Sequence, residues 1–248
     1  MIESQQPVQI TTGNPMKVLR SISRSIVSLC IAILACAEVQ AQVVTVGPPV
    51  VLVDGNTPGN YNSALGTVLD GTAPQFRLPL GLGGGDPLIF PSAEPSLAAA
   101  TNQLGNWLTP NATLNSNWQK LTNIPATWAG DTETAIIYEI QGGASGYTNV
   151  YADFDADNGV FVWVNGIYKF GARGPGLPSP AGQYEYTNIF LGHLPPGTNR
   201  IQVLREDNFD ATGYQVRITG NPVNYSGQSC VPAIPNLVSW WRAESSPW

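Results

Sequence analysis

Residues 147–172 read YTNVYADFDADNGVFVWVNGIYKFGA, and this stretch decides the fold. Apolar and polar residues alternate over residues 150–154, which is the period of a half-buried strand. The acidic segment DADNG at 155–159 is expected to end that strand, because Asp, Asn and Gly favour turns. A second strand is closed by Asn165 and Gly166, which both tolerate the positive φ angles of a tight hairpin turn. The stretch therefore predicts the central strands of a β-sandwich.

The predicted hairpin has two faces of different character. With a two-residue turn, its strands pair so that Phe161 faces Phe170. One face carries Val160, Val162, Val164 and Ile167, and the other carries Phe161, Trp163, Tyr168 and Phe170. The valine face is expected to lie in the core. The aromatic face either packs in a core under a loop, for which residues 173–183 are available, or forms a sugar-stacking platform through Trp163 and Tyr168. Large aromatic side chains are usually mostly buried, which favours the core.

The composition of the 248-residue chain favours strands and turns over helices. Charged residues make up 11%, and the sequence contains 26 Gly and 21 Pro. That mixture disfavours long amphipathic helices and is typical of short strands joined by many turns. The formal net charge of −6 argues against nucleic acid as a partner, because phosphate binding needs a basic face.

The first 41 residues have the organisation of a secretory signal peptide. Three basic residues precede the apolar run at 26–37, and small residues suited to cleavage follow, so the mature chain is expected to begin at Gln42. The true start is expected at Met16, since the residues before it are polar and unneeded. The apolar run is too short to span a bilayer, so we expect a secreted, extracellular protein without a membrane span. A lipoprotein anchored at Cys36 is the less favoured alternative.

Strand signals recur at regular spacing along the rest of the chain. In addition to those of the opening stretch, we expect strands at 50–53, 77–80, 134–140, 184–191, 200–205 and 214–219. Residues 56–75 are dense in turn residues and are expected to form a loop, and the region around 95–104 has the composition of a short helix. About eight or nine short strands with at most one short helix predict an all-β jelly-roll sandwich. This binding module is expected to span residues 42–224.

Several short motifs with recognisable spacing lie between residues 118 and 204. They are Trp118, Ile124-Pro125, Trp128, Tyr138, Asp157-Asn158-Gly159, 162–166, 177–179, Leu194, Gly197, Asn199 and 201–204. These motifs resemble those of galactose-binding-like jelly rolls, and in their order they are most similar to the sugar-binding domain of β-galactosidase-type glycoside hydrolases. The catalytic carboxylates of those hydrolases lie in a separate barrel domain. The resemblance therefore implies the fold and a non-catalytic, sugar-binding role.

The sequence changes character after residue 224. Residues 225–236 are expected to form a linker, and it contains Cys230, which has no disulfide partner in the mature chain. The apolar segment LVSWWRAE at 237–244 is similar to the first strand of a laminin-G or concanavalin-like jelly roll. A sandwich of that kind needs roughly 100 residues. We therefore interpret residues 237–248 as the truncated start of a second jelly-roll domain, and expect a C-terminal domain to be missing.

The opening stretch carries an acidic group formed by Asp153, Asp155, Asp157 and Asn158. Ca²⁺ prefers several oxygen ligands on a bent loop, and alternate Asp residues can supply them. The spacing does not follow the EF-hand pattern, so a solvated strand edge and turn is the alternative to a Ca²⁺ site.

A loop between two predicted strands carries a second polar cluster, formed by Glu206, Asp207, Asn208 and Asp210 next to Arg205, which ends the first of these strands. Carboxylate, amide and guanidinium groups can hydrogen-bond sugar hydroxyls, and loops on rigid scaffolds often carry binding sites. These residues are therefore candidate ligand contacts. A polar loop that merely ends two strands is the alternative.

Nothing in the sequence indicates an enzyme. His193 is the only histidine, and no Ser, His or Cys has the spacing of a nucleophile elbow or a zinc site. We therefore expect a secreted, non-catalytic module that binds an extracellular glycan or cell-surface component, at the N-terminus of a larger multidomain protein. A structural spacer or adhesion domain without a small ligand is the alternative.

Overall fold

The computed structural model describes residues 43–73, 76, 91–111, 113–173, 180–207 and 212–226. The sandwich described below belongs to one compact unit, Val44–Ser226. The predictions for the signal peptide, the strand at 77–80, Asn208, Asp210 and the segment 237–248 lie outside the described residues.

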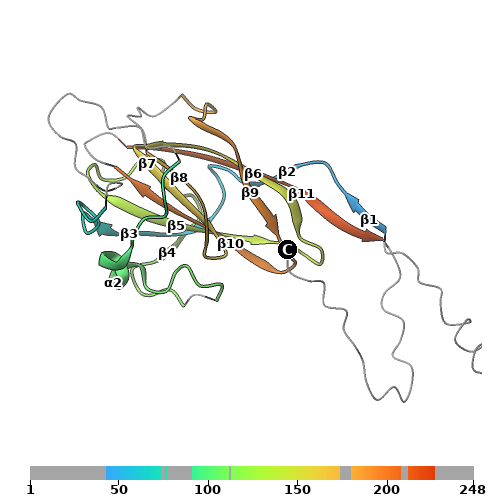
Figure 1. The fold of residues 1–248 in the computed structure, drawn as a ribbon, viewed down its shortest axis with the longest axis horizontal. Helices are drawn as coiled ribbons and strands as arrows, with labels where there is room; N and C mark the ends of the chain where they lie inside the picture. Colours follow the sequence, from blue (N-terminus) through green and yellow to red (C-terminus); the bar gives the residue numbers. More distant parts are fainter. Residues whose placement is uncertain are drawn as a thin grey trace, which may run out of the picture. The chain divides into compact units, whose positions relative to one another are not determined.

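The chain folds into two β-sheets of antiparallel strands, which confirms the predicted all-β sandwich (Figure 1). The first, called the β6 sheet, has the order β1-β11-β6-β9 with β2 paired to β11, and is made of β1 (Val43–Val46), β2 (Val50–Val53), β6 (Tyr147–Asp157), β9 (Tyr186–Leu194) and β11 (Gly213–Ser226). The second, called the β10 sheet, has the order β4-β3-β5-β10-β7-β8, and is made of β3 (Gly59–Gly66), β4 (Gln119–Leu121), β5 (Glu133–Gln141), β7 (Gly159–Val164), β8 (Ile167–Arg173) and β10 (Thr198–Glu206).

The expected short helix is confirmed, as a 3₁₀ turn, η2 (Ala98–Ala100), that runs into one α-helical turn, α2 (Thr101–Leu104). The expected loop at 56–75 is partly wrong, because β3 lies within it and pairs with β5. The residues of β3 do not alternate clearly between apolar and polar. This strand is held by pairing with both β4 and β5, a tertiary influence that outweighs its local preference.

The main core lies between the two sheets and is built from alternate residues of their strands. The β6 sheet contributes Val53, Val150, Ala152, Phe154, Ala156, Val216 and Ile218, and the β10 sheet contributes Ile136, Tyr138, Val160, Val162, Val164, Ile201 and Val203. The prediction that this face of the hairpin lies in the core is confirmed for Val160, Val162 and Val164. It is wrong for Ile167, which follows the turn at the end of the sheet and is 64% exposed. The expected turn at 155–159 is shorter than predicted: β6 continues to Asp157 and β7 begins at Gly159, so the chain crosses from one sheet to the other there.

A second core covers the outer face of the β10 sheet. It joins Ala135, Ile137, Phe161, Trp163 and Leu204 of that sheet to Leu65, Leu69, Phe76, Ala100, Leu104, Trp107 and Trp118. Trp107 lies at the centre, with its ring 5.5 Å from that of Trp163 and 5.7 Å from that of Trp118. The β10 sheet is thus buried on both faces, and the preferred interpretation of the aromatic hairpin face as core is confirmed.

The hairpin turn has the predicted two residues, with φ angles of 51° at Asn165 and 80° at Gly166. The predicted pairing of Phe161 with Phe170 is wrong, because a bulge between Val162 and Trp163 in the pairing shifts the register. Phe170 therefore lies opposite Val162 and packs in the main core.

The position opposite Phe161 is taken by Gly171. A Cβ atom at Gly171 would collide with the hydroxyl of Tyr168 and approach the Phe161 ring to 2.7 Å. Only glycine fits here, because these two aromatic side chains fill the space above the strand.

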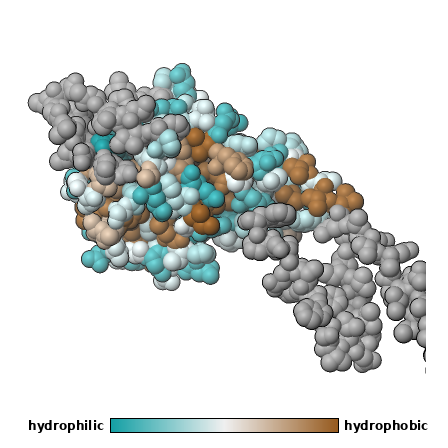
Figure 2. Space-filling view, in the orientation of Figure 1, coloured by the Kyte–Doolittle hydropathy of each residue, from teal (hydrophilic) through white to brown (hydrophobic). Residues whose placement is uncertain are grey.

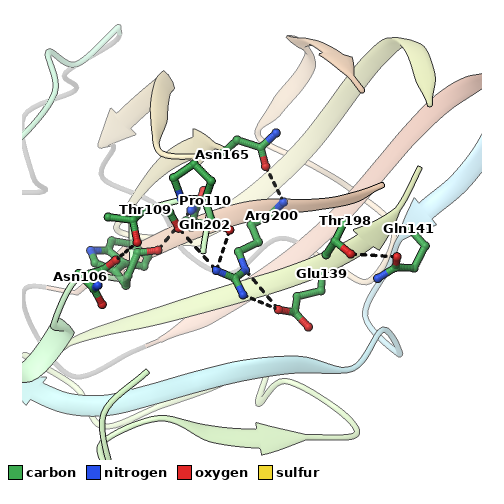
Figure 3. Close-up of polar contacts among 10 residues, drawn as sticks. Asn106, Thr109, Pro110, Glu139, Gln141, Asn165, Thr198, Arg200 and Gln202 are labelled. Carbon is green, nitrogen blue, oxygen red and sulfur yellow. Dashed lines mark hydrogen bonds and ion pairs between the residues drawn. The ribbon is translucent and has the colours of Figure 1, made fainter. Parts of the chain in front are cut away.

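The residues between β3 and β4 that pack on the outer face of the β10 sheet are called the cover of the second core. Polar side chains bind this cover to the sheet (Figure 3). The guanidinium of Arg200 donates to the Pro110 carbonyl at 3.0 Å and to Glu139 Oε1 at 3.1 Å. Gln202 Nε2 donates to the Trp107 carbonyl at 3.3 Å. These bonds tie the loop that follows α2 to β5 and β10, and so hold Trp107 over the sheet.

Candidate functional site

The described residues of the predicted polar loop are buried rather than presented to solvent. Arg205, Glu206 and Asp207 are each no more than 1% exposed. Arg205 points into the end of the main core, where its guanidinium lies 4.2 Å from the Trp128 ring centre and 4.8 Å from that of Tyr214.

Arg205 has the environment of a structural cation. It donates to Thr134 Oγ1 at 2.9 Å and to the Pro125 carbonyl at 2.7 Å. Burial lowers the pKa of its guanidinium, and the surrounding aromatic rings offset part of that desolvation through cation–π attraction. These contacts stabilise the buried charge of Arg205 at the end of the sandwich. Because its side chain is fully buried, Arg205 has no group that could contact a sugar in solvent.

A row of ionisable groups that the sequence did not reveal lies at the end of the outer face of the β10 sheet. Arg173 Nε lies 3.5 Å from Glu206 Oε1, with both side chains 1% exposed or less. Glu133 is fully buried beside them, with the carboxyl of Asp70 close to its own. Burial, followed by the negative charge of Asp70, raises the pKa of Glu133 to about 9. The Glu133 carboxyl therefore carries its proton at neutral pH.

The predicted calcium ligands follow one strand. Asp153, Asp155 and Asp157 alternate along the outer face of β6, and the latter two are only 2% and 3% exposed. Asp153 Oδ1 accepts the Asn188 N–H at 2.9 Å. Asn158, 8% exposed, follows directly after β6.

Within the part of the chain that the structure describes, no three His, Cys, Asp or Glu side chains are grouped so that they could hold a metal ion. Calcium binding at these residues stays a prediction.

The predicted stacking residues lie under the cover of the second core. Trp163 is fully buried, and its Nε1 donates to Glu94 Oε1 at 2.7 Å. The Tyr168 hydroxyl donates to the Ser92 carbonyl at 2.8 Å. Because the Trp163 indole has no solvent-facing side, it offers no platform to a sugar ring in this structure.

The β6 sheet carries an exposed aromatic pair on its outer face. Tyr151 on β6 and Phe190 on β9 are direct cross-strand neighbours and are 40% and 59% exposed. Their ring centres lie 5.2 Å apart, with 48° between the planes. The same row continues through Thr219 on β11 to Val51 on β2, which is 52% exposed. We call these four residues the aromatic row.

Polar groups flank the aromatic row on its next level. Asp153 lies two residues from Tyr151 on β6, roughly 7 Å along the strand. It pairs across the sheet with the exposed Arg217 of β11. An acidic and a basic residue are thus cross-strand neighbours one level from the exposed aromatic pair, which is an arrangement suited to a ligand with both apolar and hydroxyl surfaces.

The sequence analysis did not predict this row, although one feature of the β6 sequence pointed to it. In β6 the inward positions are apolar, and Tyr151 is an aromatic residue at an outward position otherwise held by Asn149 and Asp153. The position of Phe190 next to Tyr151 was harder to predict, because register shifts interrupt the pairing of β9 with β6.

One shallow pocket of about 260 Å³ lies elsewhere, on the cover of the second core. It is lined by Leu97, Ala98, Thr101, Leu104, Gly105, Asn106, Trp107, Leu108 and Thr109. No charged side chain lines it, so it offers little to orient a ligand.

Comparisons with known proteins found no match: no family model, curated protein or solved structure is similar to this chain. Among the described residues, no helix is both long enough and apolar enough to cross a membrane. The fold is therefore assigned as a sandwich of two antiparallel sheets.

Proposed function

We propose that this chain is a secreted, non-catalytic module that binds carbohydrate on the outer face of the β6 sheet. The observation that carries the proposal is the exposed pair of Tyr151 and Phe190 beside Asp153 and Arg217. The negatively polarised face of an aromatic ring attracts the C–H side of a sugar ring. Carboxylate and guanidinium groups hydrogen-bond the hydroxyls at the ring edge.

Both the motif resemblance and the architecture support this proposal. A sandwich of two antiparallel sheets agrees with a galactose-binding-like jelly roll, and we include that assignment, together with a laminin-G-like second domain, in the proposal. The expected absence of catalysis rests on the sequence, in which His193 is the only histidine and no nucleophile-elbow or zinc-site spacing occurs.

The test is retention of the full chain on a glycan array and on immobilised polysaccharides. The double variant Tyr151→Ala with Phe190→Ala is expected to lose about tenfold or more in affinity, which corresponds to the loss of about 1.4 kcal/mol. Ile167→Ala is the matched control, because Ile167 is 64% exposed on the other sheet. It should bind as the wild type does. Equal binding by the double variant, or no binding of any glycan by a folded wild type, would contradict the proposal.

A second candidate, adhesion to another protein, is favoured by the exposed valines of the first two strands. Val43, Val44, Val46, Val50 and Val51 are 40–55% exposed, and apolar surface gathers at the end of the β6 sheet where Figure 1 places β1 (Figure 2). An exposed apolar edge strand is a template for pairing with another chain. Val44→Lys would then abolish association, measured by sedimentation, and leave glycan retention unchanged.

A further inference from the structure

The aromatic row can be characterised further by its shape, which limits the kind of glycan that fits. This step rests on the proposed carbohydrate function of the same face. The planes of Tyr151 and Phe190 are inclined by 48° to one another. Two rings so inclined cannot both lie flat against one plane. A flat crystalline polysaccharide surface could therefore contact only one of them at a time.

The backbone under these rings is irregular as well. The pairing of β6 with β9 shifts register on both sides of Tyr151, between Val150 and Tyr151 and again between Ala152 and Phe154. Asn149 and Asn188, with φ angles of 50° and 56°, lie at the two ends of this region. Bulges increase the local twist of a sheet. The face is consequently curved where the aromatic side chains stand.

The extent of the aromatic contact is short. The centres of the two rings lie 5.2 Å apart, which is close to the spacing of neighbouring strands, about 4.8 Å. Farther along the row stand Thr219 and Val51, which are not aromatic. The stacking surface thus matches one or two sugar rings and does not extend along a chain.

The polar flank favours a ligand whose hydroxyls are free. The Asn188 N–H fixes the carboxylate of Asp153 at 2.9 Å, and Arg217 stands opposite it, exposed. In a polysaccharide crystal, neighbouring chains already hydrogen-bond the hydroxyls at the edge of each chain. A single dissolved chain has those hydroxyls available for a carboxylate and a guanidinium.

From these four observations we infer that the aromatic row binds a single, soluble glycan chain through one or two sugar rings and does not bind crystalline polysaccharide. The rings supply the stacking, and Asp153 and Arg217 supply the hydrogen bonds that orient the sugar.

The experiment measures the full chain against two kinds of probe. The first is a set of soluble neutral oligosaccharides from dimer to hexamer, built from glucose, xylose, mannose or galactose and titrated by calorimetry. The second is crystalline cellulose and crystalline chitin in sedimentation assays. We expect binding to at least one soluble series, with less than about threefold change in affinity from trimer to hexamer, and no retention on the crystals.

Matched variants connect the result to the row. Asp153→Asn and Arg217→Gln should each weaken the soluble ligand by about tenfold, the loss of one charged hydrogen-bond partner. Val46→Ala is the matched control, because Val46 on β1 is 52% exposed and lies outside the aromatic row, and it should bind as the wild type does.

Three outcomes decide the matter. Retention on crystals that depends on Tyr151 and Phe190, without binding of soluble chains, overturns this inference and leaves the proposed function standing. An affinity that increases more than about tenfold from trimer to hexamer also overturns this inference and leaves the proposed function standing, because it requires more sugar-binding positions than the two rings provide. Absence of binding to every glycan overturns the proposed function, and this inference with it.

Discussion

The outer faces of the two sheets both carry aromatic residues, which are buried on the β10 sheet and exposed on the β6 sheet. The outer face of the β10 sheet presents Phe161 and Trp163, and both are fully buried under Trp107 and its neighbours. The outer face of the β6 sheet presents Tyr151 and Phe190, which remain exposed. In each case aromatic residues alternate with inward-facing apolar ones. Aromatic residues on the outer face of a strand therefore do not show by themselves whether they are buried or available for binding. That depends on whether another segment of the chain covers the face.

The covering segment makes the difference. The residues from β3 to β4 include η2, α2 and two tryptophans, and they fold back on the β10 sheet, where Arg200 and Gln202 hold them. On the β6 sheet, the described segment 180–183 reaches only the end of the outer face, where the Gly182 N–H donates to Gln215 Oε1 at 2.7 Å. The predictions below compare the two faces, from the largest expected effect to the smallest.

Trp163→Ala tests the covered face and should be the most damaging change. Removing a fully buried indole leaves a cavity among Trp107, Tyr168 and Phe161, and typically costs about 3–5 kcal/mol in the free energy of unfolding. Urea denaturation followed by circular dichroism measures this loss. A cost below about 1 kcal/mol would mean that the second core is not packed as described.

Arg173→Met tests the charges that the cover buries. It leaves the Glu206 carboxylate, 0% exposed, without the cation 3.5 Å away, and breaking such a pair should cost about 3 kcal/mol. The double variant Arg173→Met with Glu206→Gln should recover most of that loss in the same denaturation experiment. Arg217→Met, on the open face, is the matched control and should change stability by less than about 0.5 kcal/mol.

The buried carboxyl of Glu133 predicts a pH dependence of stability. Glu133 has a pKa of about 9 in the folded protein, raised from 4.5. Between these values the unfolded chain loses a proton that the folded protein keeps. The free energy of unfolding should therefore fall as pH rises through this window, by up to about 1.4 kcal/mol per pH unit, and level off above it. Melting temperatures between pH 5 and about pH 10 measure the slope, and Glu133→Gln should flatten it. An unchanged slope in that variant would assign the dependence to other groups.

Tyr151→Ala tests the open face and should have the smallest effect on stability. An exposed cross-strand aromatic pair contributes about 0.2–1 kcal/mol, so the melting temperature should change little. The same change should remove most glycan retention. A stability loss near that of Trp163→Ala would show that Tyr151 is covered in solution and would remove the contrast between the two faces.

Much of the fold could be predicted because β5, β6 and the hairpin of β7 and β8 have strong local signals. Val160, Val162 and Val164 of the hairpin were assigned to the core and lie there, whereas Ile167, assigned to the same face, is exposed. By contrast, β3 was taken for a loop, since its pairing partners, β4 and β5, lie at least 50 residues away in the chain, an interval that no local pattern reports. The predicted pairing of Phe170 was wrong because the register of β7 with β8 shifts between Val162 and Trp163, a shift that the local turn signal does not report.

The candidate site was less accessible to prediction than the fold. Glu206 and Asp207 were expected in a ligand-binding loop next to Arg205, whereas β10 continues through Glu206 and all three side chains are buried. Tyr151 and Phe190 become neighbours only through the pairing of β6 with β9. The association of Asp70 with Glu133 likewise arises where the segment after β3 meets the start of β5.

The sequence by itself determined the class of the fold, the Asn165-Gly166 turn and the inward side of the central strands. These features follow from backbone preferences and from a period of two, both of which act over a few residues. Only the tertiary structure decided which aromatic side is covered and which is open. That choice depends on where the segment between β3 and β4 folds back, and it follows from the free energy of burying Trp107, Trp118 and Leu104 against the sheet rather than from any local pattern.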